Sequence, residues 1–167
     1  MTGFDDFFGH ILDFLAYLVG LMFGIGTALI ALDVALRNLA GIGFPWLIDA
    51  IEYGLFAGTF LAAPWVLREG AHVRVDVVVS ALPPRGAALL ETIADLIGLA
   101  VCLILLWYGV KVTLTAEALG SMVLKSIIFP EWWALAVVPL SSLLLAIEFV
   151  LRLCRAHGAA AATAQGH

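Results

Sequence analysis

The sequence has little charge. Of its 167 residues, 13% are charged and 63% are hydrophobic, whereas soluble domains carry roughly 25% charged residues. Eight Lys and Arg stand against thirteen Asp and Glu, and no dense basic cluster is present, which excludes a nucleic-acid-binding surface. The composition indicates a protein whose main solvent is not water.

Cysteine and histidine are also scarce. Cys102 lies inside an apolar block and Cys154 at the end of another, so we expect no structural disulfide. The histidines all lie outside the apolar blocks, where they cannot serve as axial ligands for a haem between helices: His10, His72, His157 and His167. No catalytic triad, nucleophile elbow or phosphate loop is recognisable. We therefore expect no enzyme activity, catalytic residue, cofactor or metal site.

What the sequence does contain is four apolar blocks of about 20 residues, the length that an α-helix needs to cross a bilayer. They predict an all-α integral membrane protein, a bundle of four transmembrane helices with short loops, over residues 14–36, 46–67, 87–108 and 130–151. The first block has no preceding Lys or Arg and is too long for a secretory signal, so it is expected to remain as an anchor. Residues 1–13 form an N-terminal segment and 152–167 a tail for which we predict disorder.

Charged and aromatic residues mark the ends of these predicted spans. Asp33 and Arg37 are four residues apart, which places opposite charges on one helix face. Asp49 and Glu52 fall in the first turns of the second helix, where the helix dipole favours negative charge. Three tryptophans are expected to anchor the helices at the interface: Trp46, Trp132 and Trp133.

Two further segments affect the helix boundaries. Pro64 is expected to kink the second helix near its end. Residues 111–126 form an amphipathic stretch, which could extend the third helix or lie along the membrane surface. The sequence leaves that choice open.

The distribution of Lys and Arg predicts an orientation. Five lie on the side of the N-terminus, the second loop and the C-terminus, and three lie on the other side. By the positive-inside rule, this places both termini in the cytoplasm. The five are Arg68, Arg74, Arg85, Arg152 and Arg155, and the three are Arg37, Lys111 and Lys125.

Small residues recur at four-residue intervals on the first two helices. Gly20 and Gly24 lie on the first, and Gly54 and Gly58 on the second. Such stripes let membrane helices approach closely. They could pack within this chain or against a larger partner.

Ionisable residues within membrane spans are costly and are often functional. The candidates are Asp33, Asp49, Glu52, Glu91, Asp95 and Glu148. All except Glu148 lie near a predicted helix end, and Glu148 could pair with Arg152 four residues later. No polar cluster or broken helix is predicted at the midplane. The chain is therefore poorly equipped to carry a polar substrate by itself.

The loop after the second helix holds the most specific local pattern, in which charged and apolar residues alternate. Its charged residues include Arg68, Arg74 and Asp76, and His72 lies between them. The segment is either a solvated interfacial loop or an element that contacts a partner.

An ordered set of motifs resembles the small, Q-type membrane subunit of tripartite ATP-independent periplasmic (TRAP) transporters. The set comprises Arg37-Asn38, Trp46 with Asp49 and Glu52, Gly70-x-His72 with Asp76, Leu82-Pro83, and Pro130 with Trp132, Trp133 and Pro139. It spans roughly residues 14–151. The chain departs from the family after Asn38, where Leu39-Ala40-Gly41 replaces the usual aromatic residues.

The resemblance implies a non-catalytic subunit that scaffolds a large membrane subunit. The large subunit would hold the substrate and sodium sites, and a periplasmic substrate-binding protein would deliver an organic acid or similar small anion. The complex would lie in the bacterial inner membrane, surrounded by lipid. Two alternatives remain open from the residues: a self-sufficient small carrier or channel lined by Asp49, Glu52, Glu91 and Asp95, and a membrane anchor for a redox enzyme.

Overall fold

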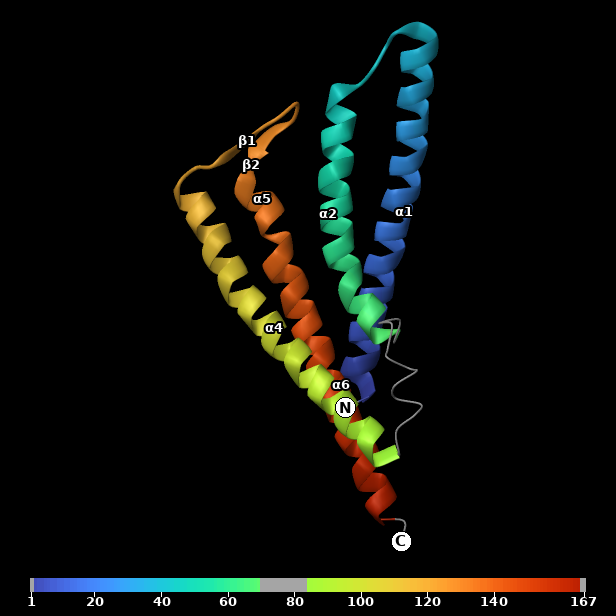
Figure 1. Ribbon diagram of the computed structural model, residues 1–167, viewed down its shortest axis with the longest axis vertical. Helices are drawn as coiled ribbons and strands as arrows, with labels where there is room; N and C mark the ends of the chain where they lie inside the picture. The colour runs from blue at the N-terminus through green and yellow to red at the C-terminus, as the bar shows by residue number, and fades with distance from the viewer. Residues whose placement is uncertain (1, 70–83, 166–167) are drawn as a thin grey trace.

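A computed structural model of the protein describes residues 2–69 and 84–165 (Figure 1). Its elements are α1 (Thr2–Ala40), α2 (Pro45–Arg68), α4 (Pro84–Ala118), β1 (Met122–Leu124), β2 (Ile128–Pro130), α5 (Glu131–Leu135) and α6 (Val137–Gln165). Four helical segments are long and apolar enough to cross a membrane, the fourth formed by α5 with α6. The predicted all-α membrane bundle is thus confirmed. The antiparallel β1–β2 hairpin was not predicted.

The long helices form a row in which α1 packs on α2, α2 on α6, and α6 on α4. The row consists of two helix pairs, α1 with α2 and α4 with α6. The pairs converge near the two chain termini and diverge toward the hairpin (Figure 1). We call these the converging end and the hairpin end.

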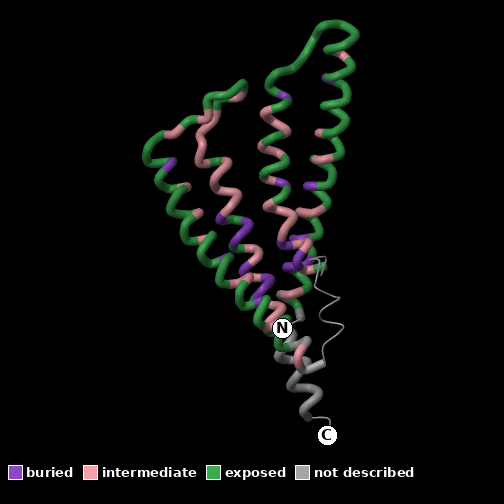
Figure 2. The backbone as a smooth tube through the Cα atoms, in the orientation of Figure 1, coloured by how far each residue is buried: buried purple, intermediate pink, exposed green. Residues whose placement is uncertain are grey.

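The outer helices of the row are mostly exposed (Figure 2). Within the most apolar 18-residue stretch of each span, only 6% of the residues are buried in α1 and in α4, against 17% in α2 and 28% in the fourth span. Large apolar side chains such as Tyr17 and Trp107 face outward. A surface this apolar must be covered by lipid or by another chain, so the protein is a multi-pass membrane protein.

The helices run beyond the spans expected from hydropathy. The 39 residues of α1 make a rod of roughly 60 Å, twice the thickness of the hydrocarbon core, because the segment 2–13 is also helical. At the other terminus, α6 continues to Gln165, through residues for which we predicted disorder. The Ala-rich composition of this tail explains the difference, since alanine is the strongest helix former.

Residues 111–126, whose conformation the sequence left open, comprise the end of α4, a helix cap and the first part of the hairpin. The first of these residues extend α4 to Ala118, and Gly120 then adopts a left-handed φ of +62°. The N–H of Ser121 donates to the carbonyl of Ala116, and the N–H of Gly120 to that of Glu117, the two bonds of a Schellman cap. After this stop, β1 begins.

Pro64 lies inside α2 and is fully buried. Because proline has no N–H, the carbonyl of Phe60, four residues earlier, loses its helical donor. The hydroxyl of Ser141 on α6 donates to this carbonyl instead. A backbone group that water cannot reach is thereby satisfied across the α2–α6 contact.

Glycines set the closest helix approaches within each pair. A Cβ added to Gly58 would lie 2.7 Å from the Phe23 ring of α1, and one added to Gly98 would lie 2.4 Å from the Phe149 ring of α6. The stripe on α2 therefore packs within the chain. A Cβ added to Gly20 or Gly24 would meet nothing within 4 Å, so the α1 stripe faces outward.

We predict that Ser141→Ala destabilises the protein by about 1 kcal/mol, because it leaves the Phe60 carbonyl without a donor. Ser142→Ala is the matched control: its hydroxyl bonds to Val138 on its own helix, a carbonyl whose helical partner is intact. Unfolding of both variants in detergent would test this. Equal losses would contradict the bridging role of Ser141.

Candidate functional site: charged clusters at the two ends of the helix row

Six charged side chains meet at the converging end, and each long helix contributes at least one. We call this set the charge cluster: Asp5, Arg68, Asp95, Glu148, Arg152 and Arg155. Three carboxylates face three guanidinium groups, so the cluster is formally neutral.

Glu148 is the centre of the charge cluster and its side chain is 0% exposed. Its Oε2 lies 3.3 Å from Nη1 of Arg68 on α2, and its Oε1 accepts a hydrogen bond from Nη2 of Arg155. The expected pairing with Arg152 is wrong. Although the i,i+4 spacing permits it, Glu148 faces α2, and Arg152 turns toward α4 instead.

Arg68 carries the network from Glu148 to α1. Its Nη1 lies 3.2 Å from Oδ1 of Asp5, and its Nη2 donates to the backbone carbonyl of Asp5. Arg155 also approaches Asp5, at 3.7 Å. Together these contacts join α1, α2 and α6.

Arg152 links the remaining helix. Its Nε lies 3.4 Å from Oδ2 of Asp95 on α4, and its Nη1 donates to the carbonyl of Leu67 near the end of α2. This second bond reaches a carbonyl in the last turn of α2, which the backbone N–H of Glu69 also approaches. Two adjacent groups of ion pairs therefore involve all four helices: one joins α1, α2 and α6, and the other joins α4 and α6.

Removing charged groups from water costs free energy, and their mutual attraction offsets this cost only when every charge has a partner. In the charge cluster each carboxylate faces a guanidinium from another helix, although the buried Oδ1 of Asp5 accepts no hydrogen bond. Removing one member would leave a buried charge uncompensated. The cluster thus fixes which helices lie together more than it adds net stability.

At the hairpin end, Asp33 organises the turn between α1 and α2. Its Oδ2 lies 2.6 Å from Nη2 of Arg37, as the spacing predicts, and its Oδ1 accepts the backbone N–H of Phe44. Gly41, with φ of +68°, ends α1. These interactions hold the start of α2 beside the end of α1.

The hairpin contacts α2 through a second charged group. Nζ of Lys125 donates to both carboxylate oxygens of Glu52, at 2.9 and 2.8 Å, and lies 5.1 Å from the Tyr53 ring centroid. The N–H of Ser126 donates to Oδ2 of Asp49 at 2.8 Å. We call this set, with Phe129 edge-on to Tyr53 at 4.9 Å, the hairpin contact.

The hydrogen bond to Glu52 raises the pKa of Lys125 above its ordinary value. A raised lysine pKa means that the stabilisation is present at neutral pH and is lost only as the pH rises through that raised value. Lys125 is therefore protonated under physiological conditions.

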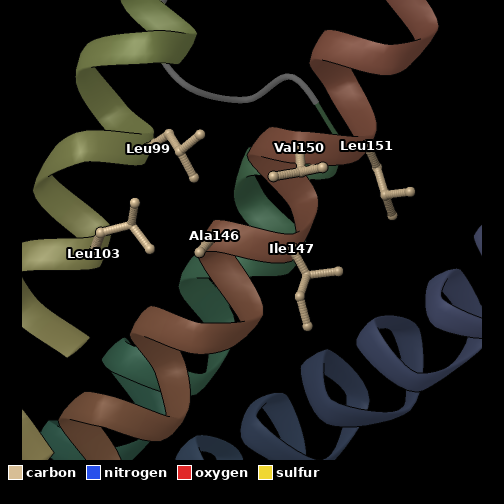
Figure 3. A pocket seen from close by; sticks show the side chains of 6 residues that line it. All are labelled: Leu99, Leu103, Ala146, Ile147, Val150 and Leu151. Atoms are coloured by element: carbon tan, nitrogen blue, oxygen red, sulfur yellow. The ribbon is translucent and has the colours of Figure 1, made fainter. Parts of the chain in front are cut away.

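The cavities in the structure are mainly apolar. The largest described here, about 400 Å³, lies between α4 and α6 (Figure 3) and is lined by Leu99, Leu103, Ala146, Ile147, Val150 and Leu151. Such a lining offers no group that could orient a polar substrate. Within residues 2–69 and 84–165, no three His, Cys, Asp or Glu side chains gather into a metal-binding group.

The structure assigns different positions to the residues predicted as partner contacts. Arg37, Asp49 and Glu52 lie at the hairpin end, and Arg68 belongs to the charge cluster. His72, Arg74 and Asp76 lie outside the described residues. Of the tryptophans, Trp46 and Trp133 are exposed, and Trp132 packs edge-on against Trp133.

Sequence reasoning missed several residues that join the helices. Asp5 and Arg155 lay outside the predicted spans, so their roles in the charge cluster went unnoticed. Asp13 accepts a hydrogen bond from the Trp65 indole at 3.0 Å, linking α1 to α2. Gly98 and Gly109 on α4 are 11 residues apart, three helical turns, a spacing that places them on one face and could have revealed them.

We predict that Glu148→Gln lowers the free energy of unfolding by about 3 kcal/mol, because Arg68 and Arg155 lose their buried counter-charge. Glu117→Gln, at an exposed position of α4, is the matched control and should change stability by less than about 0.5 kcal/mol. Unfolding in detergent provides the measurement. A Glu148→Gln variant as stable as the control would show that the cluster does not hold the helices.

Comparison with known proteins places this architecture in a transporter family. A family model described as tripartite ATP-independent periplasmic transporters, DctQ component, matches residues 26–158. A search of curated proteins found no match. The matched family is one of transporter components and not of enzymes, and the match covers all four membrane-spanning helices in whole or part. The chain belongs to the DctQ family, the small permease component of TRAP transporters.

Proposed function

We propose that this small permease subunit is a non-catalytic scaffold for the large membrane subunit of a sodium-coupled, binding-protein-dependent transporter. The observation that carries the proposal is the placement of charge. The described charged side chains gather at the two ends of the row, and the charge cluster ties all four helices together. A bundle fixed in this way suits a support better than a carrier.

The identity of the transported molecule comes only from the family resemblance, which favours an organic acid or similar small anion taken up with sodium. The apolar lining of the largest described cavity supports placing the substrate and sodium sites in another chain. The periplasmic substrate-binding protein would then deliver substrate to the large subunit.

The large subunit is proposed to pack on the exposed face of α1. This outer helix presents Gly20 and Gly24 with nothing near them, so another membrane helix can approach its backbone closely. Gly54 and Gly58 are already used within the chain. Arg37, whose side chain is 52% exposed, and the undescribed His72, Arg74 and Asp76 remain proposed partner contacts, whereas Arg68 is occupied by the charge cluster.

We further propose that the subunit lies in the bacterial inner membrane with both termini in the cytoplasm. Arg68, Arg152 and Arg155 lie at the converging end, where α4 also begins with Arg85 in its first turn; Arg74 lies outside the described residues. The excess over the hairpin end supports this orientation through the positive-inside rule.

Cys154 is exposed at the converging end and provides a direct test of orientation. A membrane-impermeant maleimide should label it in inside-out vesicles and not in intact spheroplasts. A Leu39→Cys variant in a Cys154→Ser background should show the opposite pattern, because Leu39 is 87% exposed at the hairpin end. Labelling of Cys154 from outside the cell would reverse the proposed orientation.

Assembly is tested by purifying the tagged chain from its native host in mild detergent and identifying the co-purifying proteins by mass spectrometry. We expect a large polytopic membrane protein. Recovery of this chain alone, together with ion flux in liposomes that contain only this chain, would favour the alternative of a self-sufficient carrier or channel.

The same purification locates the contact surface. Gly24→Leu should reduce recovery of the large subunit several-fold, because the added side chain separates the helices. Ala100→Leu adds bulk to an exposed position on α4 and is the control. If only Ala100→Leu reduced recovery, the large subunit would lie on α4 and not on α1.

A further inference from the structure

The hairpin adds a contact between the two helix pairs, which also meet where α2 packs on α6. It follows α4 and precedes α5, so it belongs to the α4/α6 pair, yet its polar contacts reach α2 of the other pair. The residues joined are 73 positions apart for Lys125 and Glu52, and 77 for Ser126 and Asp49. The contacts occur at the end where the two pairs diverge (Figure 1).

The two ends of the row are held in different ways. At the converging end, Glu148 is wholly buried among its partners. At the hairpin end, the Lys125 and Glu52 side chains are 39% and 60% exposed. Water and salt reach this pair and weaken it, whereas the Glu148 carboxylate and its partner Arg68, which is 19% exposed, are shielded, although Arg155 is 45% exposed.

Packing beneath the hairpin is incomplete. A cavity of about 340 Å³ lies between α2 and the hairpin side of the other pair, with Tyr53, Phe56 and Val123 among its lining residues. Apart from the edge-on contact of Phe129 with Tyr53, the hairpin is therefore not closely packed against α2 on this side. Segments with few buried contacts and exposed hydrogen bonds are the ones that open locally.

We propose that the β1–β2 hairpin is a releasable latch that sets the spacing of the two helix pairs, with the charge cluster as the pivot about which they separate when the latch opens. When the latch is closed, the hairpin binds Asp49 and Glu52 of α2. When the latch is open, the two helix pairs remain joined only at the converging end. This device goes beyond the scaffold role, because it concerns the shape of the chain by itself.

The latch is tested by electron spin resonance distance measurements on the full-length chain in lipid nanodiscs. Labels are attached at Leu39 and Leu119, which are 87% and 75% exposed, in a Cys154→Ser background. Glu52→Lys places two cations together and should shift the distance distribution to longer values and broaden it. Lys125→Glu should do the same, and the double exchange should restore the narrow distribution.

Two controls separate latch opening from misfolding or a general charge effect. Glu117→Lys makes the same charge change at an exposed α4 position and should leave the distribution unchanged. Labels at Leu39 and Leu55, both within the α1/α2 pair, should report a constant distance in every variant.

The proposal is overturned if Glu52→Lys matches Glu117→Lys while the Leu39–Leu55 distance stays constant. It is also overturned if the double exchange fails to restore the narrow distribution, because the Lys125–Glu52 pair would then not be the closing contact. Both distance measurements are made on this chain alone. They are independent of whether the large subunit co-purifies, so the latch and the scaffold role can fail separately.

Discussion

Glu148, buried between Arg68 and Arg155, is the interaction on which the rest of the structure depends. A carboxylate with no exposure is tolerated only where opposite charges surround it. Those charges come from α2 and from the next turns of α6, and Arg68 carries the constraint onward to α1. The position of each helix is thus coupled to the requirement that no charge be left without a partner.

The requirement for a partner also applies to the uncharged polar groups inside the bundle. Pro64 removes a backbone donor, and Ser141 supplies the replacement from the neighbouring helix. In a bilayer an unpaired carbonyl cannot turn to water, so this bond also specifies which face of α6 meets α2. Close packing at Gly58 and Gly98 completes the two pairs.

The two ends of the helix row differ in how they are held together, and this difference bears on function. One end is closed by charged side chains around the fully buried Glu148, and the other by exposed charge on a short hairpin. A small permease subunit built in this way combines a fixed base with an adjustable opening. Its broad apolar outer faces, on α1 and α4, are available to lipid and, in the proposed assembly, to a larger membrane subunit.

The sequence by itself determined the membrane-spanning helices, because about 20 consecutive apolar residues permit little else. It also indicated the family, through motifs in a fixed order, and the Asp33–Arg37 pair, through local spacing. Only the tertiary structure decided the partners of Glu148 and Arg152, since helix geometry allows an i,i+4 pair but cannot rank it against groups on other helices. The hairpin likewise escaped prediction: its three-residue strands are stabilised by contacts with α2, more than 70 residues away, and carry almost no local signal.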